Sequence, residues 1–328
     1  MKLWATGVFL GSAFALIALA SGASADPQFS LPLACTLGKD CFVQNYVDTD
    51  MSASAKDFTC GSLTYDGHKG TDIRLPNYVA MDRGVDVLAA APGTVLRIRD
   101  SMADISVREI GAAAVKDHEA GNGVLIDHGD GWVTQYGHMK RGSIAVKPGQ
   151  KVQAGDRLGQ VGLSGNTEFP HLHFEVRHND KPVDPFTDEP MESGCGLKGH
   201  SLWEAALAYI PTGLLGDGFA LGPAKDEAAR HGAYDATALT IQSPALVFWI
   251  DVFGLQAGDH LTLRLTGPDG AILAADDVPL DRSKAQYFAF TGSKRPGSGW
   301  KSGAYTGKVQ VVRGDQIVVE RVNQITLP

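Results

Sequence analysis

Short apolar runs separated by glycine-centred turns dominate this chain, and they restrict it to a β-rich fold. Residues 86–98 follow a pattern of strand, Pro92-Gly93 turn and strand, and residues 123–136 repeat it around Gly129-Asp130-Gly131. Such dipeptides are typical of tight turns between strands. Glycine makes up 39 of the 328 residues, which favours turns and short strands over long helices. We therefore predict a mainly β chain.

The same pattern predicts two β units. The first, residues 61–190, contains the turns just described. It also contains an insertion at residues 101–121 that has some helical character. The second, residues 239–328, holds about six short strand candidates, with hairpin turns at residues 267–270 and 313–315. That density of strands is typical of a small sandwich, so we predict a C-terminal β-sandwich of immunoglobulin-like type. Its sequence contains no catalytic constellation.

The segments outside these two units are expected to be connections. Residues 26–60 are mixed and turn-rich, which favours a lead-in to the first unit. Residues 191–238 are interpreted as a linker with one short helix, because Ser201 and Glu204 match a capping box before a helix that would end near Tyr209. Within this linker, glycine-rich residues 213–222 are expected to form a loop.

The first 25 residues are predicted to be a secretory signal peptide. Lys2 precedes an apolar run over residues 8–20, and Ala23-Ser24-Ala25 matches the small-residue cleavage pattern. An uncleaved anchor helix is the alternative, but the run is short and Gly11-Ser12 interrupts it. No later stretch is long and apolar enough to span a bilayer. We therefore expect export to the periplasm or cell envelope, with no membrane span after signal cleavage.

Export gives the four cysteines a structural meaning. An even number of cysteines in an oxidising compartment predicts disulfides. Four cysteines allow three pairings. Of these we favour Cys35–Cys41, which closes a short loop, together with Cys60–Cys195, which closes a long one. The chain has no C-x-x-C motif, so a thiolate zinc site or a redox motif has little support.

The charge balance argues against nucleic acid as a partner. The formal net charge is −8, and no block of lysine or arginine stands out. Proteins that bind nucleic acid depend on clustered basic side chains to neutralise phosphates. We therefore expect no nucleic-acid partner, and the charge does not select any other substrate.

The sharpest chemical signal is the tripeptide His171-Leu172-His173. The apolar residues around it predict a strand, on which residues two apart point to the same face. Two imidazoles that protonate near neutral pH pack poorly side by side unless they have a function, such as metal binding or proton transfer. A pair of half-exposed surface histidines is the alternative.

Two further segments add polar candidates. His68 and Asp72 would lie roughly 13 Å apart on a straight strand, so sharing a metal would require a bend, for which Gly70 supplies the freedom. A turn with an aspartate cap is the alternative. His138 closes the strand that begins at Trp132, where a single histidine is usually structural. Taken together, two histidines and one aspartate would form a three-ligand zinc set with a fourth position for water, and two further histidines could handle protons.

The order of these segments resembles that of the lysostaphin-type (LytM-type) zinc metallopeptidases, which cut the peptide part of peptidoglycan. The resemblance covers about residues 68–186. Four segments match in order: His68-x-Gly70-x-Asp72, Ala89-Ala90-x-x-Gly93-x-Val95, Tyr136-x-His138, and Gly162-x-x-Gly165 leading to His171-Leu172-His173-Phe174. Each segment is weak alone, but their order behind a signal peptide is specific.

The resemblance implies a role for each matched residue. His68, Asp72 and His173 look like the ligands of one Zn²⁺ per chain, and His138 and His171 look like the catalytic histidines. It also implies a compact antiparallel β peptidase domain with a groove across it. Two features depart from the pattern: the insertion at residues 101–121 and the β-rich region at residues 239–328.

The function expected from these observations is that of an exported zinc metalloendopeptidase acting on peptidoglycan peptide stems. One of His138 and His171 would accept a proton from water, and the sequence leaves open which. A catalytically silent scaffold that binds or activates another cell-wall hydrolase is the main alternative, and a peptidase for glycine-rich proteins is another. The C-terminal β region could offer a surface to a protein partner.

Overall fold

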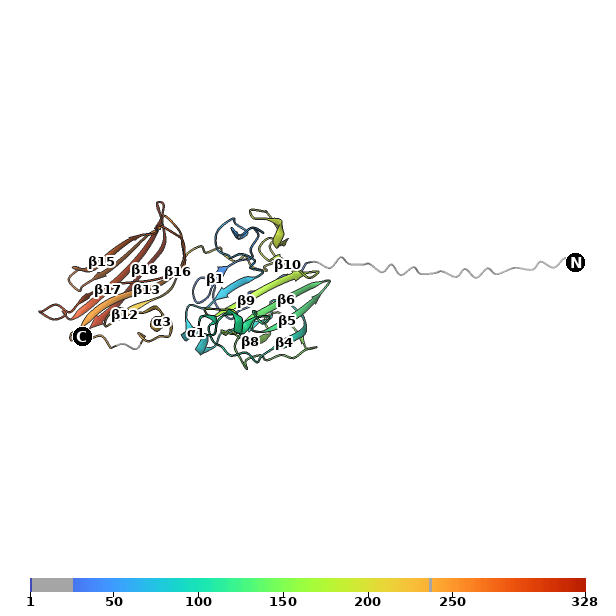
Figure 1. Cartoon of the computed structure of the whole chain (residues 1–328), viewed down its shortest axis with the longest axis horizontal. Helices are drawn as coiled ribbons and strands as arrows, with labels where there is room; N and C mark the ends of the chain where they lie inside the picture. Colours follow the sequence, from blue (N-terminus) through green and yellow to red (C-terminus); the bar gives the residue numbers. More distant parts are fainter. Residues whose placement is uncertain (2–25, 236–237) are drawn as a thin grey trace.

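The computed structural model describes Met1, residues 26–235 and residues 238–328 (Figure 1). The predicted signal peptide therefore lies outside the described residues, apart from Met1. The chain is mainly β, as predicted, and most of its buried apolar side chains gather into two large hydrophobic cores. One core is built from residues 29–203 and the other from residues 219–327. None of the helices in the described part has the length and apolar character needed to cross a membrane.

The first unit is organised around a nine-stranded sheet in which every strand pairing is antiparallel. Along its main path the strands are β1 (Phe42–Asn45), β2 (Thr71–Arg74), β9 (His171–His178), β6 (Trp132–Met139), β5 (Asn122–Gly129), β4 (Gly93–Arg99) and β7 (Lys151–Val152). β10 (Lys181–Asp184) pairs with β9, and β11 (Glu189–Pro190) pairs with β10. A separate two-stranded sheet contains β3 (Asp86–Leu88) and β8 (Arg157–Gln160).

The burial pattern of the central strands explains this sheet. In β5 the buried residues alternate with more exposed ones, which is the period-2 pattern of a strand with one covered face. Val124 and Ile126 of β5 pack with Tyr136 of β6 and Phe174 of β9 in the core. Figure 1 shows β5, β6 and β9 side by side. This packing fixes the strands that carry His138, His171 and His173.

Short helices lie at the edges of the first unit. They are α1 (Tyr78–Arg83), α2 (Val107–Ile110), the 3₁₀ helix η1 (Ala112–Val115) and the 3₁₀ helix η2 (Met191–Ser193). Asn77 caps α1 by accepting a hydrogen bond from Ala80 N at 2.9 Å, and Ser106 caps α2. α2 and η1 lie inside residues 101–121, so the helical character predicted for this insertion is confirmed.

The second unit consists of two antiparallel sheets with one shared core. The first sheet contains β12 (Gly213–Ala220), β13 (Ala245–Leu255) and β16 (Lys284–Lys294) in that order. The second has the order β15 (Ile272–Pro279), β14 (His260–Thr266), β17 (Gly303–Arg313) and β18 (Gln316–Leu327). Phe248 and Ile250 of β13 contact the same core as Leu263 of β14 and Val309 of β17. All six strands predicted in residues 239–328 are present.

The helix predicted from Ser201 to Tyr209 is absent, so this prediction was wrong. Ser201 Oγ does accept a hydrogen bond, but from Trp203 N at 3.2 Å rather than from a helical turn. Trp203 is buried against Phe29 and Phe174, and Leu202 N donates to Pro185 O at 3.0 Å. Burial of this indole in the first core outweighs the preference of a capping box. Within the described part of residues 191–238, the helices are η2 and α3 (Asp226–Arg230).

The loop predicted for residues 213–222 is also corrected, because β12 occupies residues 213–220 and pairs with β13. Its glycines provide space rather than flexibility. A Cβ on Gly218 would lie 2.8 Å from the Trp249 ring of β13, and one on Gly216 would lie 3.4 Å from it. The glycines therefore let the indole cover the strand.

Both predicted disulfides are confirmed. Cys35 is bonded to Cys41, and Cys60 is bonded to Cys195 across 135 positions of sequence. The lead-in is also more integrated than a connection, since it supplies β1 to the large sheet and Phe29 and Leu33 to the first core.

Candidate metal centre

Three donor atoms meet at the junction of β2 and β9. His68 Nε2 lies 3.1 Å from Asp72 Oδ1, His173 Nδ1 lies 2.9 Å from the same oxygen, and the two nitrogens are 3.2 Å apart. Four ligands placed tetrahedrally at zinc–ligand distances of about 2.0–2.1 Å would be about 3.3 Å from one another. The observed triangle fits that arrangement. His68 and Asp72 are buried, so the centre is shielded on these two sides.

The sheet and one glycine create this triangle. Asp72 and His173 are direct partners in the β2–β9 ladder, while His68 lies in the turn before β2. A Cβ on Gly70 would lie 2.8 Å from the His173 ring and 2.8 Å from Phe174 O. The predicted bend between His68 and Asp72 is present. Gly70 permits it because it has no side chain, and its backbone is not in the left-handed region.

The hydrogen bonds around the centre orient its donor atoms. His68 Nδ1 lies 2.7 Å from Tyr46 O, a pure acceptor, so Nδ1 carries the proton and the Nε2 lone pair faces the centre. Asn45 Nδ2 donates to Asp72 Oδ2 at 3.0 Å, which leaves Oδ1 turned to the two histidines. A lone pair and a carboxylate oxygen at 3.1 Å repel each other unless a cation lies between them. The donor set therefore fits a divalent metal.

His138 and His171 lie beside the triangle with their rings 4.6 Å apart. His138 Nδ1 is 2.7 Å from Ser164 O, and His171 Nδ1 is 3.0 Å from Phe169 O. Both contacts are to carbonyl oxygens, so both Nδ1 atoms carry protons. His171 Nε2 is 3.4 Å from Asp72 Oδ1, which places it at the edge of the centre.

The backbone of His138 is held in an uncommon conformation. Its φ is +58°, in the left-handed region that favours glycine. His138 N donates to Ala120 O at 2.8 Å, and His138 O accepts from Gly162 N at 3.0 Å. Such strain persists where surrounding contacts enforce it, and it is common at functional sites.

Burial and neighbouring charges shift the protonation of the centre. Burial lowers the pKa of His138 well below its ordinary value, and His171 and His173 add to this effect. Burial opposes the charge on Asp72, but His68 and His171 hold the pKa of its carboxyl well below the usual range. Burial would also lower the pKa of His173, yet hydrogen bonds with Asp72 and Glu175 raise it to about 9. Asp72 is therefore an anion and His138 a neutral imidazole at pH 7.

Comparison with known proteins identifies the family of this domain. The family model described as "Peptidase family M23" matches residues 66–185. Residues 66–185 form a domain of peptidase family M23. This is the lysostaphin-type family that the sequence resembles, and all five site residues lie within the matched range.

The M23 domain has relatives among curated proteins and solved structures. Cell division protein DipM of Caulobacter vibrioides is 38 % identical over 35 % of this chain and 16 % of its own length. Peptidoglycan DD-endopeptidase ShyA of Vibrio cholerae is 33 % identical over 40 % of this chain and 25 % of its own length. The matches thus span a quarter or less of these relatives. A mutant catalytic domain of the prophage-encoded M23 protein EnpA from Enterococcus faecalis is 31 % identical, covering 36 % of this chain and 72 % of that one, with a TM-score of 0.27.

A pocket of about 510 Å³ opens onto the triangle of the M23 domain. Tyr65 lines it and stacks on the His68 ring at 4.4 Å between centroids. Glu119 and Ala120 line it from the end of the insertion at residues 101–121. The insertion therefore forms part of the wall beside the histidines. Asn166 lines the same pocket, and Thr167 Oγ1 lies 3.1 Å from His171 Nδ1, so both border the site.

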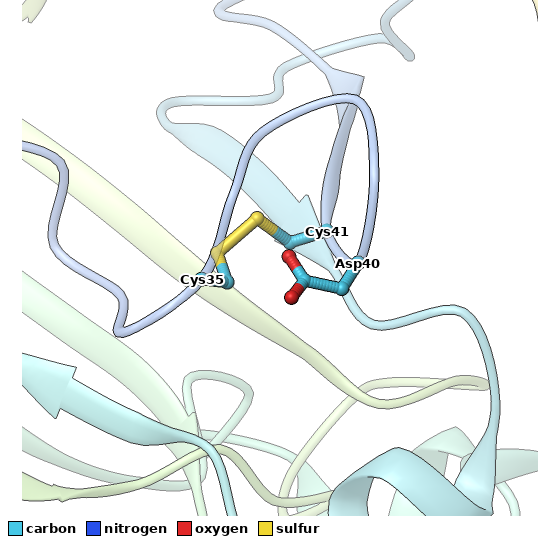
Figure 2. Close-up of side chains that lie close together, drawn as sticks. All are labelled: Cys35, Asp40 and Cys41. Atoms are coloured by element: carbon cyan, nitrogen blue, oxygen red, sulfur yellow. A yellow bond between two sulfur atoms is a disulfide. The ribbon is translucent and has the colours of Figure 1, made fainter.

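A second group of potential metal-binding residues is not a metal site. Cys35, Asp40 and Cys41 lie close together, but Figure 2 shows the sulfurs joined by a disulfide beside the Asp40 carboxylate. Disulfide sulfurs are not thiolates and do not act as zinc ligands. Asp40 Oδ1 instead accepts a hydrogen bond from Thr36 N at 2.6 Å, which closes the small loop.

Several supporting residues were not predicted from the sequence. Asn45 and Tyr46 come from the lead-in and contact Asp72 and His68, and Ser164 contacts His138. Two of these contacts are made by backbone carbonyls, which every residue type has, so the sequence gives no sign of them. Glu175 also supports the centre, because its Oε2 lies 3.8 Å from His173 Nε2. Arg177 Nε in turn donates to Glu175 Oε1 at 2.7 Å.

Proposed function

We propose that this protein is an exported zinc metalloendopeptidase that hydrolyses peptide cross-links of peptidoglycan. The observation that carries the proposal is the arrangement of five side chains. Three donor atoms converge within 3.2 Å of one another, and two histidines beside them are oriented by Nδ1 contacts with backbone carbonyls. Relatives named as peptidoglycan DD-endopeptidases support the choice of substrate.

His68, Asp72 and His173 would hold one Zn²⁺, with the fourth position open to water. Zinc bound there would supply a Lewis acid that polarises a carbonyl and lowers the pKa of water to about 7. Asn45 and the Tyr46 carbonyl orient Asp72 and His68. Supporting hydrogen bonds of this kind fix the direction of ligand lone pairs.

His138 and His171 are proposed to move protons. Each Nδ1 lies against a backbone carbonyl. His138 lines the pocket, and His171 Nε2 lies 3.4 Å from Asp72 Oδ1 at the edge of the centre. One Nε2 would accept the proton of the attacking water, and the other ring would stabilise the developing oxyanion or protonate the leaving amine. The lowered pKa of His138 keeps it neutral, as a proton acceptor must be.

The remaining parts of the chain fit an envelope protein. Two disulfides are expected of a protein that folds in an oxidising compartment, which supports cleavage after residue 25 and export to the periplasm or cell envelope. We propose an immunoglobulin-like class for the C-terminal sandwich, because its first, second and fifth strands form one sheet and the other four form the second. The scaffold alternative has less support, because the chain retains all five residues.

The proposal is tested with the mature protein and purified peptidoglycan sacculi. We expect about one zinc per chain by elemental analysis, together with release of soluble peptide-containing fragments from the sacculi. His173→Ala should lose both, while His200→Ala, a change at an exposed histidine, should lose neither. Zinc binding without any release of fragments would contradict the proposal and favour the scaffold.

A further inference from the structure

A cleft of about 480 Å³ lies where the C-terminal sandwich meets the M23 domain. The two units are held together beside it by stacked rings. Tyr78 of α1 stacks on His231 at 4.1 Å between centroids, and Phe42 of β1 packs on Phe253 of β13 at 5.4 Å. Figure 1 shows the sandwich next to α1 and β1. The cleft is lined by residues of both units, so it exists only when they are joined.

The lining of this cleft is strongly cationic although the chain carries a net charge of −8. Its charged residues are Arg74, Arg108, Arg230, Arg282, Lys284 and Glu168. Glu168 pairs with Arg108. Arg230 pairs with Asp251 at 2.8 Å, and also with Asp226 at 3.3 Å and Glu227 at 3.6 Å. Among the described residues, Arg282 and Lys284 have no ion-pair partner. After these pairings the cleft keeps an excess of positive charge.

Arg74 is the most informative of these residues. Its side chain is one of the largest that are fully buried, at 1 % exposure, yet no carboxylate of the described residues lies within ion-pair distance of it. Its Nε donates to Leu75 O at 3.2 Å, and Nη1 donates to the neutral amides of Gln44 and Gln286. Nη2 has no partner in the described part of the chain. The Asp251 carboxylate reaches this charge only through Gln286, whose Nε2 donates to both Asp251 oxygens. Arg74 thus has no direct ion-pair partner, and its Nη2 remains available to an anion in the cleft.

One aromatic ring connects the cleft to the candidate metal centre. The Arg74 guanidinium lies over the Phe169 ring at 4.4 Å, and the centroids of Phe169 and His171 are 4.8 Å apart. Asp72 and Arg74 are two positions apart on β2, a rise of about 7 Å along a strand. The cleft and the metal centre are therefore separated along β2 by the length of about two residues.

We propose that this cleft binds a carboxylate of the peptide substrate, so that the C-terminal sandwich supplies part of the substrate-binding surface. The inference rests on the proposed peptidase function. A guanidinium presents a planar fork that pairs with a carboxylate through two hydrogen bonds, and Lys284 adds a point charge. Arg282 and Lys284 come from the sandwich, so this unit would select peptides that carry a free carboxylate.

A binding experiment tests the cleft separately from catalysis. The zinc-loaded mature protein is titrated with N-acetyl-D-alanyl-D-alanine, with its C-terminal amide and with inorganic phosphate, by calorimetry. The double variant Arg282→Gln/Lys284→Gln should bind the carboxylate peptide roughly tenfold or more weakly. The matched control Arg264→Gln/Lys294→Gln removes the same charge from exposed positions of the same sandwich and should bind like the wild type. Arg74→Lys, which keeps the charge but loses the fork, should also weaken binding.

Three results of this titration would overturn the inference. They are unchanged affinity in the Arg282/Lys284 double variant, equal affinity of the wild type for the amide, and equal affinity for inorganic phosphate. The last would show a general oxyanion site instead of a site for a peptide carboxylate.

Kinetics distinguishes failure of the cleft from failure of the proposed function. With peptidoglycan-derived peptides, the Arg282/Lys284 variant should raise KM by about tenfold at unchanged kcat and zinc content. Cleavage at an unchanged KM would refute the cleft while the peptidase function stands. Carboxylate-dependent binding without any cleavage would refute the peptidase function and leave the cleft as a peptide-binding site.

Discussion

Arg74 and His171 are direct partners in the antiparallel ladder between β2 and β9. Two positions away in the same ladder, Asp72 is the partner of His173. One pair of facing residues therefore contains a buried cation, Arg74, and a proposed proton carrier, His171. The other pair contains two proposed metal ligands, Asp72 and His173. Any change at Arg74 is expected to disturb His171 as well. Exposed Arg282 and half-buried Lys284 therefore give a cleaner test of the cleft.

Removal of either proposed proton carrier should separate catalysis from metal binding. His138→Ala and His171→Ala are each expected to lower kcat by about 10²–10⁴-fold, the usual contribution of general acid–base catalysis. Neither residue belongs to the triangle of donor atoms, so zinc content should remain near one per chain. Sacculus digestion and elemental analysis on the same samples measure both effects. Turnover close to the wild type in either variant would show that the proposed role is wrong.

Asn45→Ala should weaken zinc binding although Asn45 is not a proposed ligand. Its amide donates to Asp72 Oδ2 at 3.0 Å and so directs Oδ1 toward the two histidines. Loss of such a supporting contact typically costs about 10–100-fold in metal affinity. Competition with a chromogenic chelator measures the change, and Gln153→Ala, at an exposed position without side-chain contacts to the centre, is the control. Equal affinities in the two variants would argue against this role.

Asp184 is expected to make the protein less stable as the pH rises. Burial raises the pKa of its carboxyl to about 7, and the charge of Asp57 adds to this. The folded state thus binds a proton more tightly than the unfolded state, in which the pKa is about 3.9. The stabilising contribution is complete below about pH 4 and is lost as the pH rises through about 7.

The substitution Asp184→Asn should remove this dependence and raise the free energy of unfolding at pH 8. The amide retains an oxygen that can accept the Phe186 N–H, which Asp184 Oδ1 now accepts at 2.8 Å. Thermal unfolding between pH 5 and pH 8 measures the effect, with Asp180→Asn at an exposed turn as the control. The prediction fails if the wild type and Asp184→Asn show the same change in Tm with pH.

The two disulfides should contribute unequally to stability. In the chain-entropy model, the Cys60–Cys195 bond closes a loop long enough to contribute about 4–5 kcal/mol, whereas the short Cys35–Cys41 loop contributes about 2 kcal/mol. Cys60→Ser/Cys195→Ser should therefore lower the free energy of unfolding more than Cys35→Ser/Cys41→Ser. Urea denaturation of both double variants tests this order, and the reverse order would contradict it.

Much of the candidate site could be predicted because its residues lie close together in short stretches of sequence. The alternation of His171, Leu172 and His173 requires only the two-residue period of a strand, and the structure places both imidazoles at the centre. The paired cysteines were predictable from their even number and the expected compartment. By contrast, the capping box at Ser201 is a local signal that a distant contact overrides, since Trp203 is buried against Phe29 and Phe174.

The sequence by itself determined the β-rich character, the two units and the set of five residues, because strand periodicity, turn residues and motif spacing are local properties. Tertiary structure alone decided what surrounds them. Asn45 reaches Asp72 across 27 positions, and Arg74 reaches Gln286 across 212. Such contacts depend on how the strands pair and how the two units pack, and local sequence patterns do not predict either. For that reason the orientation of the metal ligands and the cationic cleft emerge only in the folded chain.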